Sequence, residues 1–196
     1  IGSTIANVWL PHTLSDVANV ILNYMKTKEI DTKNLFPSFP TGGIIINKND
    51  IHTIYETGKG KVILRGRAEI KGNSILITEL PYQIYAQPYV EKITDMAAKE
   101  DLTGIVAVYN KSGKNKLLIE IECDGSPERV LKQLYAKTDL QKNYNANQWA
   151  LVGKTPKLLT LKEYCDIYIA HNIDCLLKEK QFDLDKAKAR LEVVQG

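Results

Sequence analysis

Cysteine and histidine are scarce in this 196-residue chain, and their scarcity argues against two kinds of site. The three cysteines are odd in number, widely spaced and without a CxxC pair, so we expect neither a disulfide framework nor a zinc site. The three histidines are isolated as well. These residues are Cys123, Cys165, Cys175, His12, His52 and His171. The sequence therefore predicts no metal site and no cofactor held by this chain.

Long apolar runs are also missing. No run approaches the roughly 20 residues that cross a bilayer. The first segment, IGSTIANVWLPHTL, lacks the cationic region and apolar core of a signal peptide. With 44% apolar and 25% charged residues the composition is that of a globular protein. We expect no membrane contact and a cytoplasmic location.

The small net charge of +3 comes from one place. The segment YETGKGKVILRGRAEIK, residues 55–71, carries five cations and two carboxylates, so the remaining chain sums to zero. The cations are Lys59, Lys61, Arg65, Arg67 and Lys71. Basicity confined to one segment indicates a local surface for an anionic partner, or a solvated strand face.

Capping signals predict two helices with defined starts. Thr13 and Asp16 form a capping-box spacing before the apolar residues Val17, Val20, Ile21 and Tyr24, which recur at helical intervals. Thr160 and Glu163 repeat the signal before a segment of roughly 35 residues without proline or glycine. A helix this long needs a partner, so we expect the chain to be a piece of a larger protein.

Between these helices the pattern is mixed. Residues 44–47 read as a short buried strand, and alternation over residues 61–70 predicts a strand that pairs with residues 74–80 across the turn KGNS. That alternation places Lys61, Arg65 and Arg67 on one strand face. A helix over 87–100, a second hairpin over 104–123 and a helix begun by Ser126 and Pro127 follow. We therefore expect an α+β fold with small, mostly antiparallel sheets.

The basic segment fits no nucleotide-binding loop. TGKGKV lacks the spacing and the hydroxyl of a P-loop, and Gly58 and Gly60 supply only half of a GxGxxG pattern. A solvated edge strand and a nucleic-acid backbone surface both remain open. No aromatic residue is interleaved with the cations, which favours duplex contact over single-strand stacking.

Several stretches in collinear order resemble the breakage-reunion (A) chain of bacterial type IIA DNA topoisomerases, the gyrase A and topoisomerase IV A family. LPHTL, FPTGGII, the basic segment, ITELPYQIYAQPYVEKI and LYAKTDLQKNYNANQWALVGKTPKLLTLKE are similar to its motifs and together cover nearly the whole chain. The chain departs from the family at FPS before FPT, at Tyr85 and at CLLKEK in the long helix. These departures indicate a divergent member.

The resemblance implies three parts: residues 1–30 as the tail of the winged-helix region and a linking helix, 31–158 as a tower domain, and 159–196 as the first helix of a coiled-coil arm. It implies an ATP-dependent parent enzyme that cuts, passes and reseals duplex DNA. The cleaving tyrosine and its neighbouring arginine lie upstream of the matched region. No catalytic residue is therefore expected here, and the chain alone should be inactive. The parent would form an A-subunit homodimer and obtain Mg²⁺ and ATP through its B subunit.

The expected role of the chain is to support and bend a gate duplex. The candidate DNA-binding residues are Ile1, Lys59, Lys61, Arg65 and Arg67. Ile1 aligns with the isoleucine that the family wedges between base pairs, a known bending device. Two alternatives remain: a stand-alone interaction module that dimerises through the long helix, and a topoisomerase-derived inhibitor. Gyrase and topoisomerase IV cannot be distinguished from this segment.

Overall fold

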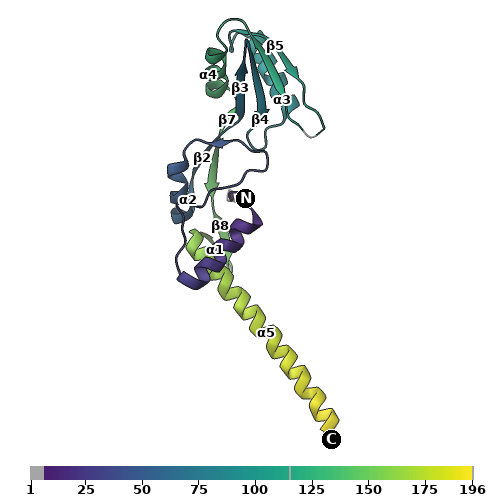
Figure 1. Ribbon diagram of the computed structural model, residues 1–196. Coiled ribbons are helices and arrows are strands. Elements are labelled where there is room, and N and C mark those ends of the chain that lie inside the picture. The colour runs from purple at the N-terminus through teal and green to yellow at the C-terminus, as the bar shows by residue number, and fades with distance from the viewer. Residues whose placement is uncertain (1–6, 115, 196) are drawn as a thin grey trace, which may run out of the picture.

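The computed structural model of the protein describes residues 7–114 and 116–195. Figure 1 shows an elongated molecule made of two stacked bodies and a projecting C-terminal helix. We call residues 67–140 the upper body, and residues 7–65 together with 141–160 the lower body. The expected α+β class, with small antiparallel sheets and one long helix, is confirmed. None of the described helices is both long and apolar enough to span a membrane.

The lower body begins with α1 (Leu14–Thr27), which starts where its capping signal predicts. The backbone N–H of Asp16 donates to Thr13 Oγ1 at 3.2 Å, which satisfies one of the free amides of the first turn. Of the predicted apolar face, only Tyr24 is fully buried, and Val17 remains 42% exposed. The Tyr24 hydroxyl donates to Asp166 Oδ1 at 2.5 Å and so ties α1 to the C-terminal helix.

A three-stranded antiparallel sheet in the order β1-β2-β7 forms the centre of the lower body. Its strands are β1 (Ile44–Ile45), β2 (Lys59–Arg65) and β7 (Gln141–Asn147). The short helices η1 (Lys48–Asp50) and α2 (Ile51–Thr57) precede β2, and α2 packs on it. The core beneath the sheet consists of Leu10, Leu35, Ile51, Ile54, Tyr55, Val62 and Ala146.

One prediction for this region was wrong, and one helix was missed. Residues 44–47 do not form a buried strand, because β1 has two residues and Ile44 is 40% exposed. Helix α2 was not predicted, since its seven residues are too few to show a helical period. Its apolar residues nevertheless carry much of the core, with Ile51, Ile54 and Tyr55 at most 1% exposed. Short elements of this kind take their structure from the tertiary contacts they make.

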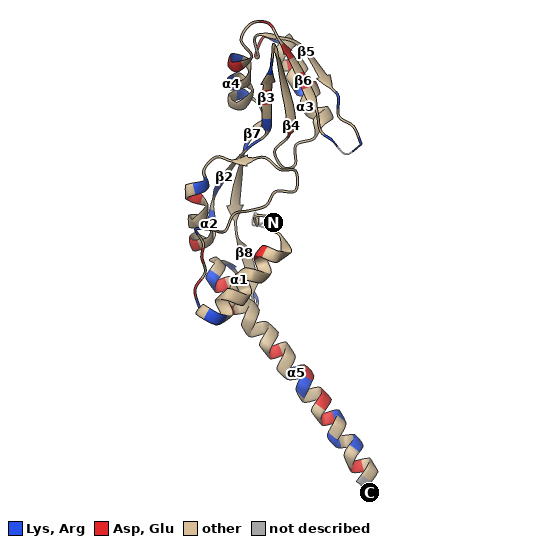
Figure 2. Cartoon of the chain, viewed as in Figure 1, with Lys and Arg blue, Asp and Glu red and all other residues tan. Residues whose placement is uncertain are grey.

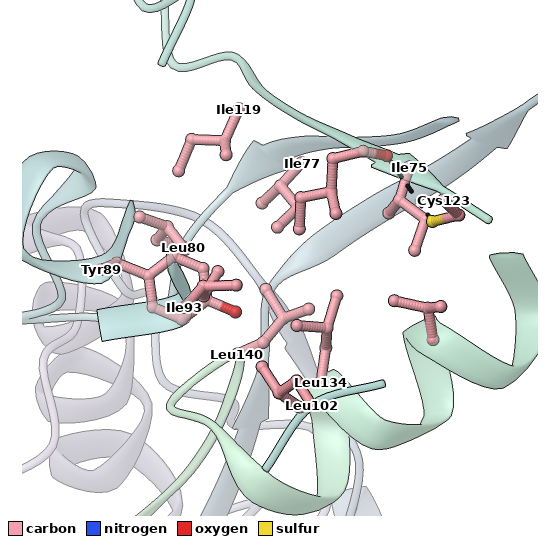
Figure 3. Close-up of a cluster of buried hydrophobic side chains, with 12 residues drawn as sticks. Ile75, Ile77, Leu80, Tyr89, Ile93, Leu102, Ile119, Cys123, Leu134 and Leu140 are labelled. Atoms are coloured by element: carbon pink, nitrogen blue, oxygen red, sulfur yellow. Dashed lines mark hydrogen bonds between the residues drawn. The ribbon is translucent and has the colours of Figure 1, made fainter. Parts of the chain in front are cut away.

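The upper body is an antiparallel sheet in the order β3-β4-β6-β5, with two helices on one face. Strands β3 (Arg67–Lys71) and β4 (Ser74–Glu79) form one hairpin, and β5 (Ile105–Asn110) and β6 (Ile119–Cys123) form the other. Helices α3 (Ala86–Ala98) and α4 (Pro127–Lys137) cover the face that carries the isoleucines of β4 and β6. Figure 3 shows these side chains closing one apolar core. Both hairpins were predicted in place, apart from the start of the first.

That first hairpin begins later than the alternation predicts, because the chain changes sheets at Gly66. Residues 59–65 pair with β1 and β7, whereas only 67–71 pair with β4. A Cβ at Gly66 would lie 2.5 Å from the carbonyl oxygen of Glu79, so only glycine lets the chain pass this close to the end of β4 where it changes sheets. The prediction of one continuous strand over 61–70 was therefore wrong.

A third small sheet leads into the arm. Strands β8 (Trp149–Val152) and β9 (Thr155–Leu158) pair antiparallel, and α5 (Leu161–Gln195) follows. Its predicted capping box is present: Thr160 N–H donates to Glu163 Oε2 at 3.0 Å, and Glu163 N–H donates to Thr160 Oγ1 at 3.2 Å. Beyond its first turns α5 extends away from both bodies (Figure 1). Apolar side chains such as Leu176, Leu177 and Phe182 are more than half exposed along it.

Candidate nucleic-acid interface

The outward side of β2 and β7 brings cations and amides together. In an antiparallel pair, partners across the ladder point to the same side and successive residues alternate between sides. Val62 and Leu64 are buried toward the core at 0% and 1% exposure, so their neighbours on β2 face outward. We call the following set the cation–amide face, each β2 residue with its β7 partner: Lys59 with Asn147, Lys61 with Asn145, Ile63 with Asn143, and Arg65 with Gln141.

No carboxylate interrupts this face. Neither KGKVILR nor QKNYNAN contains Asp or Glu. Among the residues that the structure describes, Lys59 and Lys61 form no ion pair. Figure 2 shows Lys and Arg on β2 in the middle of the molecule. The one Lys of β7, Lys142, pairs with Leu64 and therefore points to the other side of the sheet. Ammonium, guanidinium and carboxamide groups all donate hydrogen bonds to phosphate oxygens. The face is therefore suited to a polyanion.

Arg65 is held in one orientation on this face. Its Nε and Nη2 donate to Gln141 Oε1 at 2.9 and 2.7 Å, and its guanidinium lies 4.3 Å from the centre of the Tyr135 ring. Burial raises the pKa of Tyr135, and the nearby Arg65 charge partly offsets that rise. A guanidinium fixed by stacking and one acceptor keeps its other N–H groups for an incoming oxygen at little cost in conformational entropy.

The edge of the sheet beside Lys61 is closed by a side chain. Asn47 Nδ2 donates to the carbonyl oxygen of Lys61 at 2.7 Å, and Ile63 N–H donates to Asn47 Oδ1 at 2.8 Å. This amide continues the hydrogen-bond ladder past the two-residue strand β1. The backbone that carries Lys61 is thus paired on both sides, and the position of Lys61 does not depend on its own side chain.

Arg67 lies elsewhere. It begins β3 in the upper body, where its Nε donates to Glu79 Oε1 at 3.1 Å. The expectation that Arg65 and Arg67 share one strand face was wrong, because the switch at Gly66 places them in different sheets. Lys59, Lys61 and Arg65 do share a face, as the alternation of β2 predicts. Ile1 lies outside the described residues.

Sequence reasoning missed the amide half of the face. Gln141, Asn143, Asn145 and Asn147 alternate with residues that face inward, such as Ala146, and this period of two was the available signal. Their position opposite β2 follows only from a pairing between strands about eighty residues apart. Among the described residues, no group of three or more His, Cys, Asp or Glu side chains lies close enough to hold a metal ion.

Fold and face together define an α+β scaffold with a cationic sheet surface and a long helical arm. The family model for the A chain of DNA gyrase/topoisomerase IV matches residues 1–196, and the protein belongs to this family. It is 33% identical to the gyrase A protein of Streptococcus pneumoniae serotype 4 and 36% identical to the topoisomerase 4 A protein of Streptococcus pyogenes serotype M18. Each alignment covers 95% of this chain and 24% of the relative, so the chain spans about a quarter of their length.

Proposed function

We propose that this chain is the duplex-holding scaffold within the breakage-reunion chain of an ATP-dependent type II DNA topoisomerase, and that it supports and bends the duplex to be cut. The observation that carries the proposal is the cation–amide face, which offers only phosphate-binding side-chain types around Ile63. Family membership supports duplex DNA as the anion. In this proposal residues 1–30 are the tail of a winged-helix region and a linking helix, 31–158 form the tower, and 159–196 are the first helix of a coiled-coil arm.

The spacing of β2 fits a nucleic-acid backbone. Alternate residues of a strand are separated by about 6.6 Å, close to twice the 3.4 Å rise per nucleotide of one DNA strand. Lys59 and Lys61 can therefore lie at alternate phosphates along one strand, and Arg65, about 13 Å beyond Lys61, at about the fourth phosphate further on. Each neutralised phosphate releases counterions and adds salt-dependent affinity. Contacts of this kind offset the cost of bending a 20–30 bp site, on the order of 1–6 kcal/mol.

Cleavage chemistry would come from outside this chain. A tyrosine nucleophile must be accessible and readily deprotonated, which excludes Tyr55 and Tyr89, since they are 1% and 2% exposed and burial raises the pKa of both. Tyr85 and Tyr109 are exposed, so for them the proposal relies on the family resemblance, which places the cleaving tyrosine upstream of the matched region. Tyr55 also bonds His12 Nε2 at 2.7 Å, which suits a packing role. We propose that the parent enzyme acts as an A-subunit homodimer with a B subunit that supplies Mg²⁺ and ATP, and that this chain alone is inactive.

Duplex binding by the 196-residue chain tests the proposal. We expect the chain to bind a duplex of about 24 bp with little sequence preference, and we expect its affinity to fall steeply as the salt concentration rises. A nicking assay with supercoiled plasmid should show no cleavage. The double variant Lys59→Ala/Lys61→Ala should weaken binding of every sequence alike. A chain that dimerises but has no duplex affinity would support the interaction-module alternative. Loss of an added topoisomerase's activity without duplex binding would support the inhibitor alternative.

A further inference from the structure

A carboxylate makes one of several contacts between the two bodies, beside the stacking of Arg65 on Tyr135, the ring contact of Phe39 with Tyr82 and the hydrogen bond from the Tyr144 hydroxyl to the Tyr82 carbonyl oxygen. Glu79 ends β4 in the upper body, and its side chain reaches the loop before β1 in the lower body. Gly43 N–H donates to Glu79 Oε2 at 2.6 Å, while Arg67 Nε donates to Glu79 Oε1 at 3.1 Å. One side chain therefore holds both the loop of the lower body and a candidate DNA-binding cation of the upper body.

The loop is shaped around this carboxylate. Gly42 and Gly43 have φ values of +76° and +99°, which side chains of L-residues rarely adopt. A Cβ at Gly42 would lie 2.5 Å from Glu79 Oε2 and would push the carboxylate away. Two adjacent glycines thus allow the backbone to close on Glu79. A charge-assisted hydrogen bond of 2.6 Å is among the strong kinds that proteins form.

We propose that Glu79 is a positioning residue for duplex DNA, and that it acts with these other contacts to fix the upper body against the lower body so that Arg67 and the cation–amide face contact one duplex together. The inference rests on the function proposed above. β2 is about 23 Å long at 3.3 Å per residue, which matches roughly seven base pairs at 3.4 Å per base pair. A longer duplex must continue past β2, where the orientation of the second body decides whether Arg67 is reached.

The sign of the effect separates this role from simple electrostatics. Glu79 is an anion beside a DNA-binding surface, with 32% of its side chain exposed, so its charge repels phosphate. If Glu79 affected binding through its charge alone, removing this carboxylate would tighten the binding of any duplex. A positioning role requires the opposite for a duplex that spans both bodies. Glu79 can assist binding only through the geometry that it maintains.

Three variants distinguish the two effects. Glu79→Ala removes the charge and the acceptor. Glu79→Gln removes the charge but keeps an acceptor for the Gly43 amide, and Gly42→Ala keeps every charge while displacing the carboxylate. Binding is measured for a duplex of about 24 bp, which spans both bodies, and for a hairpin duplex of about 7 bp, the length that β2 alone spans. Hydrogen exchange of the Gly43 amide reports the contact itself, and circular dichroism checks the fold.

We expect Glu79→Ala and Gly42→Ala to weaken binding of the longer duplex by roughly fivefold, at the lower end of usual coupling between two sites. Both should leave binding of the shorter duplex unweakened and lose protection at the Gly43 amide. Glu79→Gln should keep that protection and bind both duplexes at least as tightly as the natural chain. Equal or tighter binding of both lengths by all three variants would overturn the positioning role while leaving the proposed function intact. Absence of duplex binding by the natural chain would overturn both.

Discussion

Lys61→Ala gives the most direct test of the proposal that the cation–amide face binds DNA. Lys61 is exposed, its backbone is held by Asn47, and no ion pair is lost with its side chain among the described residues. The variant should therefore fold normally, with a stability change within about 0.5 kcal/mol. Its effect on binding then reports the lost charge. A cation that neutralises one phosphate contributes a slope of about −0.9 to the plot of log K against log salt concentration.

That slope sets the size of the expected change. Raising salt from about 50 to about 200 mM is a fourfold change, so one lost contact alters the ratio of the natural and variant association constants by about 3.5-fold. The ratio of the association constant of the natural chain to that of Lys61→Ala should fall by that factor over this range of salt concentration. Fluorescence anisotropy with the labelled longer duplex across a series of salt concentrations resolves such a difference.

Asn145→Ala is the matched control, because Asn145 is the cross-strand partner of Lys61 and carries no charge. Losing a neutral hydrogen bond worth about 1 kcal/mol should weaken binding about fivefold at every salt concentration and leave the slope unchanged. Parallel plots for Lys61→Ala and the natural chain would refute phosphate contact by Lys61. A reduced slope for Asn145→Ala would refute the separate roles given to cations and amides.

Three further predictions concern the fold. Gly66→Ala should lower the free energy of unfolding in urea by about 1–3 kcal/mol through overpacking at the junction, against little change for Gly113→Ala, where an added Cβ meets nothing within 4 Å. Desolvation lowers the pKa of His12 in the folded chain below its ordinary value of 6.5, so as pH falls the unfolded chain binds the proton before the folded chain does. The free energy of unfolding should therefore fall as pH drops below 6.5. His12→Gln should flatten this pH dependence. Cys175 is exposed whereas Cys165 and Cys123 are buried with raised pKa values, so one thiol should react rapidly with an aromatic disulfide reagent at a pH of about 8, and all three after unfolding.

The sequence-based prediction was correct where the determining residues lie within a few positions of one another. The capping boxes at Thr13 and Thr160 placed the starts of α1 and α5 correctly, since the side chain and the amide it satisfies lie within one turn. The hairpin turn at Gly72 was found for the same reason, because glycine permits the positive φ that a tight turn needs. Such features depend on neighbouring residues and little else.

Non-local pairing could not be predicted in the same way. Alternation over residues 61–70 continues smoothly through Gly66, and nothing in that segment shows that Gly66 must fit against Glu79 and Leu140. The partner of β2 is β7, a polar strand without the β-branched residues that usually mark strands. The cations of β2 were therefore found from sequence, whereas the amides opposite them and the separate location of Arg67 required the fold.

The junction between Tyr24 and Asp166 has a mechanical consequence for the molecule. Helix α5 has 35 residues, which makes it about 52 Å long at 1.5 Å per residue, and its attachment to α1 lies within the first two turns. About 44 Å of helix lies beyond Asp166 at 1.5 Å per residue, so a rigid rotation of ~10° about that attachment would displace the far end by about 8 Å. Small angular adjustments of the lower body are thereby converted into large displacements at the end of the arm.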